Sequence, residues 1–143
     1  SQPKFYFFDT GIYRTIRPAG PLDSPEEIGG IALETLFFQN LLAVIQTLEL
    51  GYKLFYYRTA TGIEVDFVAY GPRGMIAFEV KHSGRFSESM LKGLKYFLKD
   101  YPQARAYLLY LGNETLYFDK ITVLSIKKAL IALDKILRNN HHD

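Results

Sequence analysis

The stretch that decides the fold is residues 53–82, which read KLFYYRTATGIEVDFVAYGPRGMIAFEVKH. It contains three runs rich in aromatic and β-branched residues, separated by two short segments that contain Gly. Because such segments between apolar runs are typical of hairpins, the stretch predicts a three-stranded antiparallel meander. The expected strands are Lys53 to Thr59, Ile63 to Tyr70 and Met75 to His82.

Helical patterns lie on both sides of this meander. Before it, Ser24-Pro25-Glu26-Glu27 combines a capping Ser, a Pro at the first helical position and a Glu three residues after the cap. This pattern predicts a long helix that ends at Gly51. After the meander, apolar residues at helical spacing predict a helix from Ser87 to Asp100, and Ser125 is placed to cap a final helix that ends near Arg138.

Further strands are expected at Lys4 to Asp9, Ala104 to Leu111 and Thr115 to Phe118. The segment Asp9-Thr10-Gly11 resembles a turn, and a brief helical stretch is expected around Ile12 to Ile16. The alternation of helices and strands predicts one α/β domain over residues 1–143, built as a mixed sheet flanked by helices.

Composition limits the classes of function. The chain has 143 residues and 48% hydrophobic content, which is enough for one domain with a sizeable core. It has no cysteine, so disulfides, thiolate zinc sites and cysteine nucleophiles are excluded. We expect a cytoplasmic protein, because no apolar run is long enough to span a bilayer and residues 1–9 do not resemble a signal peptide. The net charge of +2 is too small to indicate nucleic-acid binding by itself.

Glu34 is an acid on the apolar face of the expected long helix. At about 100° per residue, it shares this face with Phe38, Leu41 and Ile45. A carboxylate among apolar neighbours needs a cation or several hydrogen-bond donors, because an unpaired buried charge is costly. Two interpretations follow, a structural ion pair to a Lys or Arg of the sheet and a functional acid.

Strand alternation brings three more charged residues into the same region. Asp66 is expected on the strand face opposite to Val65 and Phe67, and Glu79 and Lys81 share one face of the next strand. If the register places both polar faces on the same side of the sheet, the three charged side chains converge. The alternative is an exposed sheet face with cross-strand salt bridges. The apolar residues on the same faces favour a cleft over that alternative.

These residue types suit metal-assisted phosphodiester cleavage. The carboxylates of Asp66 and Glu79, with the backbone carbonyl of Val80, are oxygen ligands of the kind that Mg²⁺ or Mn²⁺ binds. The metal would lower the pKa of a bound water, while Lys81 could hold that water or stabilise negative charge on the phosphate. Without metal, crowding should raise the pKa of at least one of the three acids Glu34, Asp66 and Glu79, and Lys81 should oppose this shift.

Asp66, twelve intervening residues and then Glu79-Val80-Lys81 resemble the PD-(D/E)XK phosphodiesterase signature. Glu34 on the preceding helix matches the helical acid that many members of that superfamily carry. Val65 stands where the superfamily has Pro. The resemblance implies a restriction-endonuclease-like fold and a magnesium-dependent nuclease, in which Glu34, Asp66, Glu79 and Lys81 are catalytic and Asp66, Glu79 and Val80 hold the metal.

A narrower resemblance covers nearly the whole chain. Four segments in order are similar to the uncharacterised C-terminal domain of bacterial and archaeal AAA-type ATPases: Phe8-Asp9-Thr10-Gly11, Tyr57-Arg58-Thr59, Glu64-Val65-Asp66-Phe67 and Phe78-Glu79-Val80-Lys81. The resemblance implies that an ATPase module precedes this domain in a longer protein. The chain itself has no G-x-x-x-x-G-K-[ST] motif, so no ATPase activity is assigned to it.

Basic residues outside the acidic set are candidate contacts for DNA or RNA. Arg58 could pair with a carboxylate or contact phosphate. His82 follows the motif lysine on the opposite strand face, which indicates a structural residue. The second function class is a catalytically silent module that docks nucleic acid, senses or dimerises for the ATPase, and a homodimer stays open. Further candidate phosphate contacts are Arg85, Lys92, Lys95 and Lys99, although the charge pattern alone favours a solvated helix face.

Overall fold

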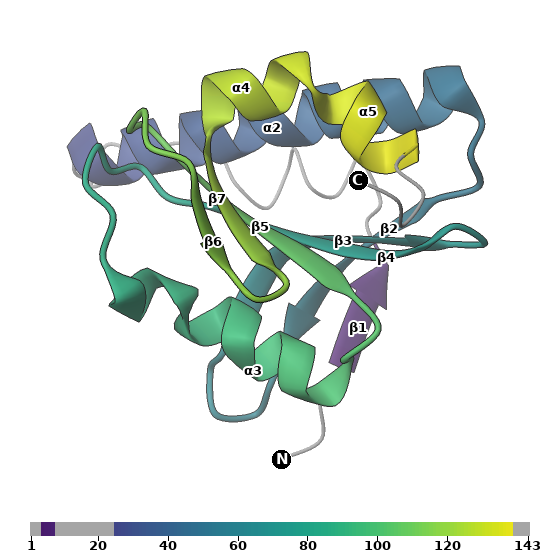
Figure 1. Ribbon diagram of the computed structural model, residues 1–143, viewed down its shortest axis with the longest axis horizontal. Helices are drawn as coiled ribbons and strands as arrows, with labels where there is room; N and C mark the ends of the chain where they lie inside the picture. Colours follow the sequence, from purple (N-terminus) through teal and green to yellow (C-terminus); the bar gives the residue numbers. More distant parts are fainter. Residues whose placement is uncertain (1–3, 8–24, 139–143) are drawn as a thin grey trace.

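A seven-stranded sheet forms the centre of the molecule, and helices cover both of its faces (Figure 1). The computed structural model describes residues 4–7 and 25–138, with side chains from residue 29 onwards. In space the strand order is β1, β2, β3, β4, β5, β7, β6. The strands are β1 (Lys4–Phe7), β2 (Lys53–Arg58), β3 (Glu64–Gly71), β4 (Gly74–Val80), β5 (Arg105–Tyr110), β6 (Leu116–Phe118) and β7 (Ile121–Ser125).

The sheet is mixed because one connection crosses its face. Strands β1 to β4 run antiparallel to their neighbours, as the meander prediction requires. The 3₁₀-helix η1 (Glu88–Leu91) and helix α3 (Lys92–Asp100) then carry the chain over one face, so that β5 pairs with β4 in parallel. Strand β7 continues in parallel beside β5, and β6 forms an antiparallel edge. The predicted mixed α/β sheet flanked by helices is confirmed.

The helices divide the core into two layers. Helices α2 (Pro25–Leu48), α4 (Ile126–Ile131) and α5 (Leu133–Arg138) lie on one face of the sheet, while η1 and α3 lie on the other (Figure 1). The α2 layer contains sheet residues such as Phe67 and Phe78. The α3 layer contains Val68 and Ala77 from the same two strands. Both faces of the central strands are therefore buried.

Helix α2 begins at Pro25, as its capping pattern predicts, and ends at Leu48. Glu49 and Gly51 follow with φ of 51° and 85°, left-handed values that end a helix. By length and composition, the stretch Gly29–Leu48 is long and apolar enough to cross a membrane. We had expected no apolar run of that length in the chain. Core helices of soluble proteins meet the same criterion, and Phe37 and other residues of α2 are buried against the sheet.

The prediction that side chains alternate strictly between the two faces along β3 is wrong, because the strand contains a β-bulge. Val65 and Val68 pair with Tyr57 and Phe55 of β2, so three steps on β3 match two on its neighbour. As a result Val65 and Val68 both belong to the α3 layer, whereas Phe67 belongs to the α2 layer. The bulge falls at Asp66 and Phe67, where the candidate site begins.

The C-terminal part contains one strand more than we predicted. The strands expected at residues 104–111 and 115–118 correspond to β5 and β6, but β7 lies between β6 and α4 and pairs with both β5 and β6. The Ser125 side chain accepts a hydrogen bond from the Lys128 backbone N–H at 3.1 Å, which confirms the predicted cap. The final helix is interrupted at Ala132. The turn expected at Asp9-Thr10-Gly11 and the helical stretch around residues 12–16 lie outside the described residues.

Candidate functional site

The candidate site lies where β3 and β4 separate. Their backbone pairing runs from Gly71 and Gly74 to Phe67 and Phe78 and goes no further. Beyond it, the Val80 backbone N–H donates to Oδ2 of Asp66 at 2.8 Å, so a side chain replaces the neighbouring strand. We call this place the fork. The bulge in β3 supplies the extra residue that directs Asp66 into it.

Strand β5 holds the other side of β4 in place past the fork. Glu79 and Val80 pair with Leu108 and Leu109, and the Lys81 backbone N–H donates to the Leu109 carbonyl at 2.8 Å. In a strand the N–H and C=O of one residue point the same way. Because the Val80 N–H meets Asp66, the Val80 carbonyl also faces the fork.

Glu79 is the most deeply buried charged residue of the site, with 6% of its surface exposed. Its Oε2 lies under the first turn of α3, 3.1 Å from where a β-carbon on Gly93 would be. Burial, followed by the negative charge of Asp66, raises the pKa of Glu79 from 4.5 to about 8. Lys81 opposes this rise, whereas Glu34 and Glu64 add to it. The prediction that one acid has a raised pKa is confirmed, and burial is its largest cause.

Glu34 reaches this group from helix α2. The residues one turn and two turns further along, Phe38 and Leu41, are buried against the sheet, and Glu34 itself is half-buried. Its charge acts on the pKa of Glu79, which places the two carboxylates in the same electrostatic neighbourhood. The four predicted site residues therefore share one electrostatic neighbourhood, with Glu34 on α2, Asp66 on β3, Glu79 on β4 and Lys81 directly after β4.

The donor set fits one divalent ion but contains no complete side-chain cage. Among the residues that the structure describes, no three His, Asp or Glu side chains form a metal-binding group. What the fork offers is two carboxylates, Asp66 and Glu79, and the Val80 carbonyl. Mg²⁺ keeps several waters and commonly takes only one or two protein carboxylates, so these oxygens fit it. A cation would also relieve the repulsion that raises the pKa of Glu79.

The candidate phosphate contacts lie on three different segments, β2, the loop after Lys81 and α3. Arg58 is paired, since its Nη2 lies 2.6 Å from Oε1 of Glu64 and its Nε lies 2.9 Å from the same oxygen. Arg85 is exposed in the loop after Lys81. Three exposed lysines lie on α3, but at about 100° per residue they are turned roughly 100° to 160° from Gly93, which faces Glu79. These lysines are Lys92, Lys95 and Lys99.

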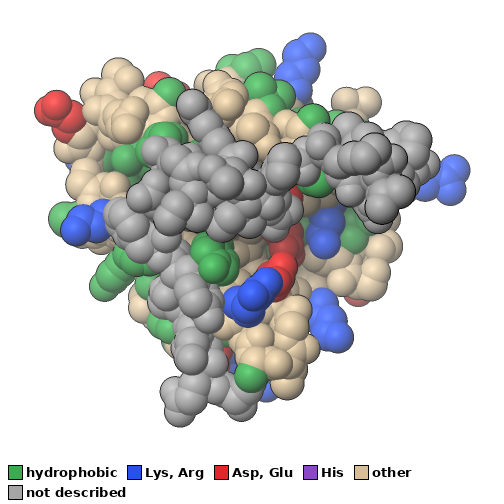
Figure 2. Space-filling model, turned by 180° about the vertical axis from the view of Figure 1, so that it is seen from behind, with side chains coloured by type: hydrophobic (Ala, Val, Ile, Leu, Met, Phe, Trp, Pro, Cys, Tyr) green, Lys and Arg blue, Asp and Glu red, His purple; other side chains and the backbone are tan. Residues whose placement is uncertain are grey.

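The surface has no uniformly basic face in the view of Figure 2. Seen from behind, the described side chains near the middle of the molecule include acidic and basic groups close together (Figure 2). The ring of His82 lies against α2, where a β-carbon on Gly29 would be 2.8 Å from its Cε1. This contact agrees with a structural role for His82. A nucleic-acid interface on Arg58, Arg85 and the α3 lysines therefore stays a prediction.

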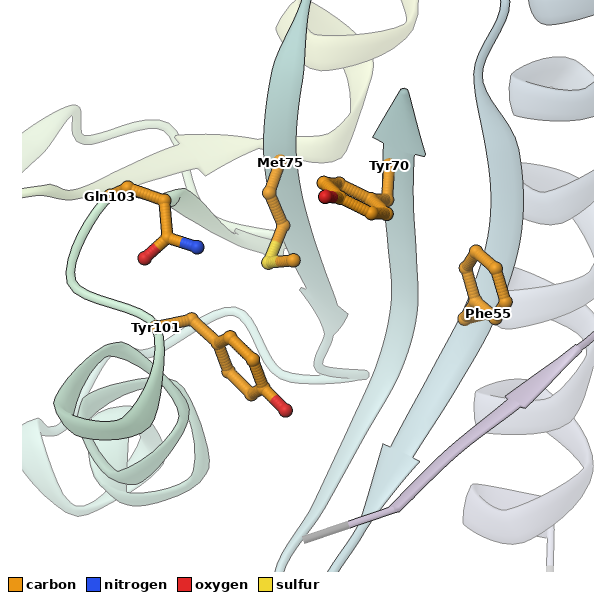
Figure 3. Close-up of a pocket in the computed structure, with 5 residues that line it drawn as sticks. All are labelled: Phe55, Tyr70, Met75, Tyr101 and Gln103. Carbon is orange, nitrogen blue, oxygen red and sulfur yellow. The ribbon is translucent and has the colours of Figure 1, made fainter. Parts of the chain in front are cut away.

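Sequence reasoning missed two features near or beside the site. Gly93 was not singled out, although a glycine inside an apolar helical pattern is a signal of a close approach. The second is an apolar hollow of about 300 Å³ at the turn between β3 and β4 (Figure 3). It lies beside Tyr101 at the C-terminal end of α3, whereas Glu79 lies at the N-terminal end, so it does not belong to the fork. Its lining residues are Phe55, Tyr70, Met75, Tyr101 and Gln103.

No curated protein matches the chain. A family model does match it over residues 29–129, which is about two thirds of its length and extends from α2 into α4. The matched region contains Glu34, the fork and Gly93. The chain therefore belongs to the DUF4143 family, which is described as a domain of unknown function.

Proposed function

We propose that the chain is a metal-dependent phosphodiesterase of the PD-(D/E)XK type that acts on nucleic acid. The observation that carries the proposal is the fork, where the carboxylates of Asp66 and Glu79 lie beside the main chain of Val80 and the side chain of Lys81. Within the described part of the chain, three acids and one base act on the buried Glu79 carboxylate, an arrangement that is unfavourable for folding, and such groups are common at functional sites.

Each residue has a chemical task in this proposal. Asp66, Glu79 and the Val80 carbonyl would hold the metal, with the second carboxylate oxygens oriented by hydrogen bonds such as the one from the Val80 N–H. A bound Mg²⁺ or Mn²⁺ supplies a water of lowered pKa and neutralises charge on the phosphate. Lys81 donates hydrogen bonds to the phosphate oxygen on which negative charge develops. Glu34 helps to orient the attacking water and to take its proton.

Two resemblances support the substrate and the partner. The order of Asp66 and Glu79-Val80-Lys81 along the chain matches the PD-(D/E)XK signature, and a mixed sheet flanked by helices suits the restriction-endonuclease-like fold. The four-segment resemblance to C-terminal domains of AAA-type ATPases makes an ATPase module of a longer protein the proposed partner. DNA and RNA both contain the required phosphodiester.

A catalytically silent docking module is the second candidate, and the raised pKa of Glu79 is compatible with it. With a pKa of about 8, Glu79 carries a proton at neutral pH when no metal is bound, so it is then a neutral buried group. A fold that only served an ATPase could keep Glu79 in this state. The two candidates differ in whether the protein binds a divalent cation tightly enough to displace that proton.

The test measures metal binding first and cleavage second. Calorimetric titration with Mn²⁺ and Mg²⁺, followed by incubation with single-stranded and double-stranded DNA and RNA, should show binding and metal-dependent cleavage. Asp66→Asn and Glu79→Gln should lose both, because each removes a charged ligand and keeps the size of the side chain. Glu64→Gln is the matched control, since Glu64 is exposed and already paired with Arg58. Absence of metal binding by the parent protein would leave only the docking module.

A further inference from the structure

Helix α3 makes its closest approach to the site at Gly93. A β-carbon at this position would lie 2.7 Å from the backbone carbonyl oxygen of Glu64 and 3.1 Å from Oε2 of Glu79. The first distance is shorter than van der Waals contact allows, and a backbone carbonyl within a strand cannot move away easily. Any side chain at position 93 therefore requires α3 or β3 to shift.

Conformational freedom does not explain the glycine. Gly93 is the second residue of α3, and the glycines with left-handed φ among the described residues are Gly51, Gly62 and Gly74. Backbone geometry therefore does not require a glycine at position 93, and the reason for it lies in packing. That reason is the space occupied by Glu79 and by the Glu64 carbonyl.

We infer that Gly93 is a positioning residue, which lets the first turn of α3 close over the fork and fix the carboxylate of Glu79 against it. The role of Gly93 in metal binding rests on the proposed function, whereas its effect on the position of the Glu79 carboxylate does not. Glu79 is 6% exposed because α3 covers it, and Leu91 and Leu94 on either side of Gly93 are fully buried and anchor this turn. A methyl group at position 93 would have to lift the turn or turn Glu79 aside.

A second glycine in a helix provides the control. Gly30 in α2 also lies inside a helix near the site, but a β-carbon there would be 3.8 Å from Cβ of His82, which is an ordinary contact. Gly30→Ala and Gly93→Ala therefore make the same chemical change in the same kind of element. Only Gly93→Ala places a methyl group against Glu79 and the Glu64 carbonyl.

The experiment has two readouts on the parent protein and both variants. In the metal-free protein, the side-chain carboxyl ¹³C signal of Glu79 should move in Gly93→Ala and stay in place in Gly30→Ala. In calorimetric titrations with Mn²⁺, Gly93→Ala should bind about tenfold more weakly or worse, as outer-shell changes do, and Gly30→Ala should bind like the parent. Thermal melts check that both variants are folded at the temperature of measurement.

The outcomes separate this inference from the proposed function. If the Glu79 signal does not move in Gly93→Ala, Gly93 is a packing residue and the inference is wrong. An unchanged Mn²⁺ affinity in Gly93→Ala would also overturn it. If the parent protein binds no Mn²⁺, the proposed metal site fails, and the carboxyl signal alone then decides whether Gly93 positions Glu79. If Gly93→Ala is unfolded at the temperature of measurement, the same carboxyl shift is required at a lower temperature at which its thermal melt shows it to be folded.

Discussion

The change Glu79→Gln should make the metal-free protein more stable at neutral and alkaline pH. In the folded state burial and neighbouring carboxylates raise the pKa of Glu79 from 4.5 to about 8. Below pH 4.5 the group is protonated in both the folded and the unfolded state, so the parent loses nothing there. As the pH rises from 4.5 to 8, the unfolded state releases the proton and the folded state keeps it, so stability falls.

The size of the effect follows from the shift. Each unit of pKa difference corresponds to about 1.4 kcal/mol, so the parent should lose on the order of 5 kcal/mol across this window. Glutamine has nearly the shape of a protonated glutamate and does not titrate. The difference in unfolding free energy between Glu79→Gln and the parent should therefore be small below pH 4.5 and should grow in favour of the variant until about pH 8.

Urea unfolding at a series of pH values measures this difference directly, provided that metal is removed and both proteins show the same slope with urea. A structural ion pair between Glu79 and Lys81 makes the opposite prediction, because deleting the acid would leave Lys81 half-buried without its partner. Loss of roughly 3 kcal/mol or more at all pH values would then be expected. A variant that is less stable than the parent at pH 8 would refute the reasoning.

Three further changes test other parts of the structure. Asp66→Asn should lower the pKa of Glu79 toward 4.5, because the carboxylate of Asp66 is the neighbouring charge that raises this pKa most. Carboxyl NMR titration would measure the pKa, and an unchanged value would contradict the geometry of the fork. Tyr52→Phe should destabilise the protein by about 1 kcal/mol in denaturant unfolding, because the Tyr52 hydroxyl donates a buried hydrogen bond to the Leu137 carbonyl at 2.7 Å. No loss of stability would mean that a water molecule takes the place of the Tyr52 hydroxyl. Arg58→Ala should cost under about 1 kcal/mol, because its ion pair with Glu64 is exposed, so a larger loss in thermal melts would indicate a buried role.

The fold was largely predictable because local signals and burial agree. The meander between residues 53 and 80 carries apolar runs and glycine turns, and α2 begins at Pro25 as its cap indicates. Strand β7 was missed because Ser125, its last residue, is also the cap of α4, and because its pairing with β5 is between residues distant in sequence. The two-residue turn Asp119-Lys120 that joins β6 to β7 contains neither Gly nor Pro, although Asp119 adopts a left-handed φ of 54°, so this hairpin lacks the usual glycine signal.

The site was predictable in its members and not in its geometry. Helical phase placed Glu34 on the buried face of α2, and the spacing of Asp66 and Glu79 placed them on adjacent strands. Alternation could not predict that a bulge turns Asp66 into the gap beside Val80, because a bulge depends on the pairing of two strands and not on the residues of one. Gly93 was missed for the same reason, since its neighbours Glu64 and Glu79 are distant along the chain.

The charge balance of the fork bears on whether it is a functional site or a structural network. A structural network satisfies a buried charge, because one unpaired ion within a fold costs several kcal/mol. Among the described residues, the charges of Asp66, Glu34 and Glu64 disfavour ionisation of Glu79, and the charge of Lys81 favours it. The protein accommodates the conflict by keeping a proton on Glu79, at a pKa of about 8, and by covering the group with α3 at Gly93.

A divalent cation at the fork would remove the conflict by replacing that proton, and the stability gained on binding would grow as the metal-free protein loses stability with rising pH. Thermal melts with Mn²⁺ at pH 6 and pH 8 should therefore show the larger stabilisation at pH 8, and equal shifts at both values would mean that Glu79 does not take part in binding.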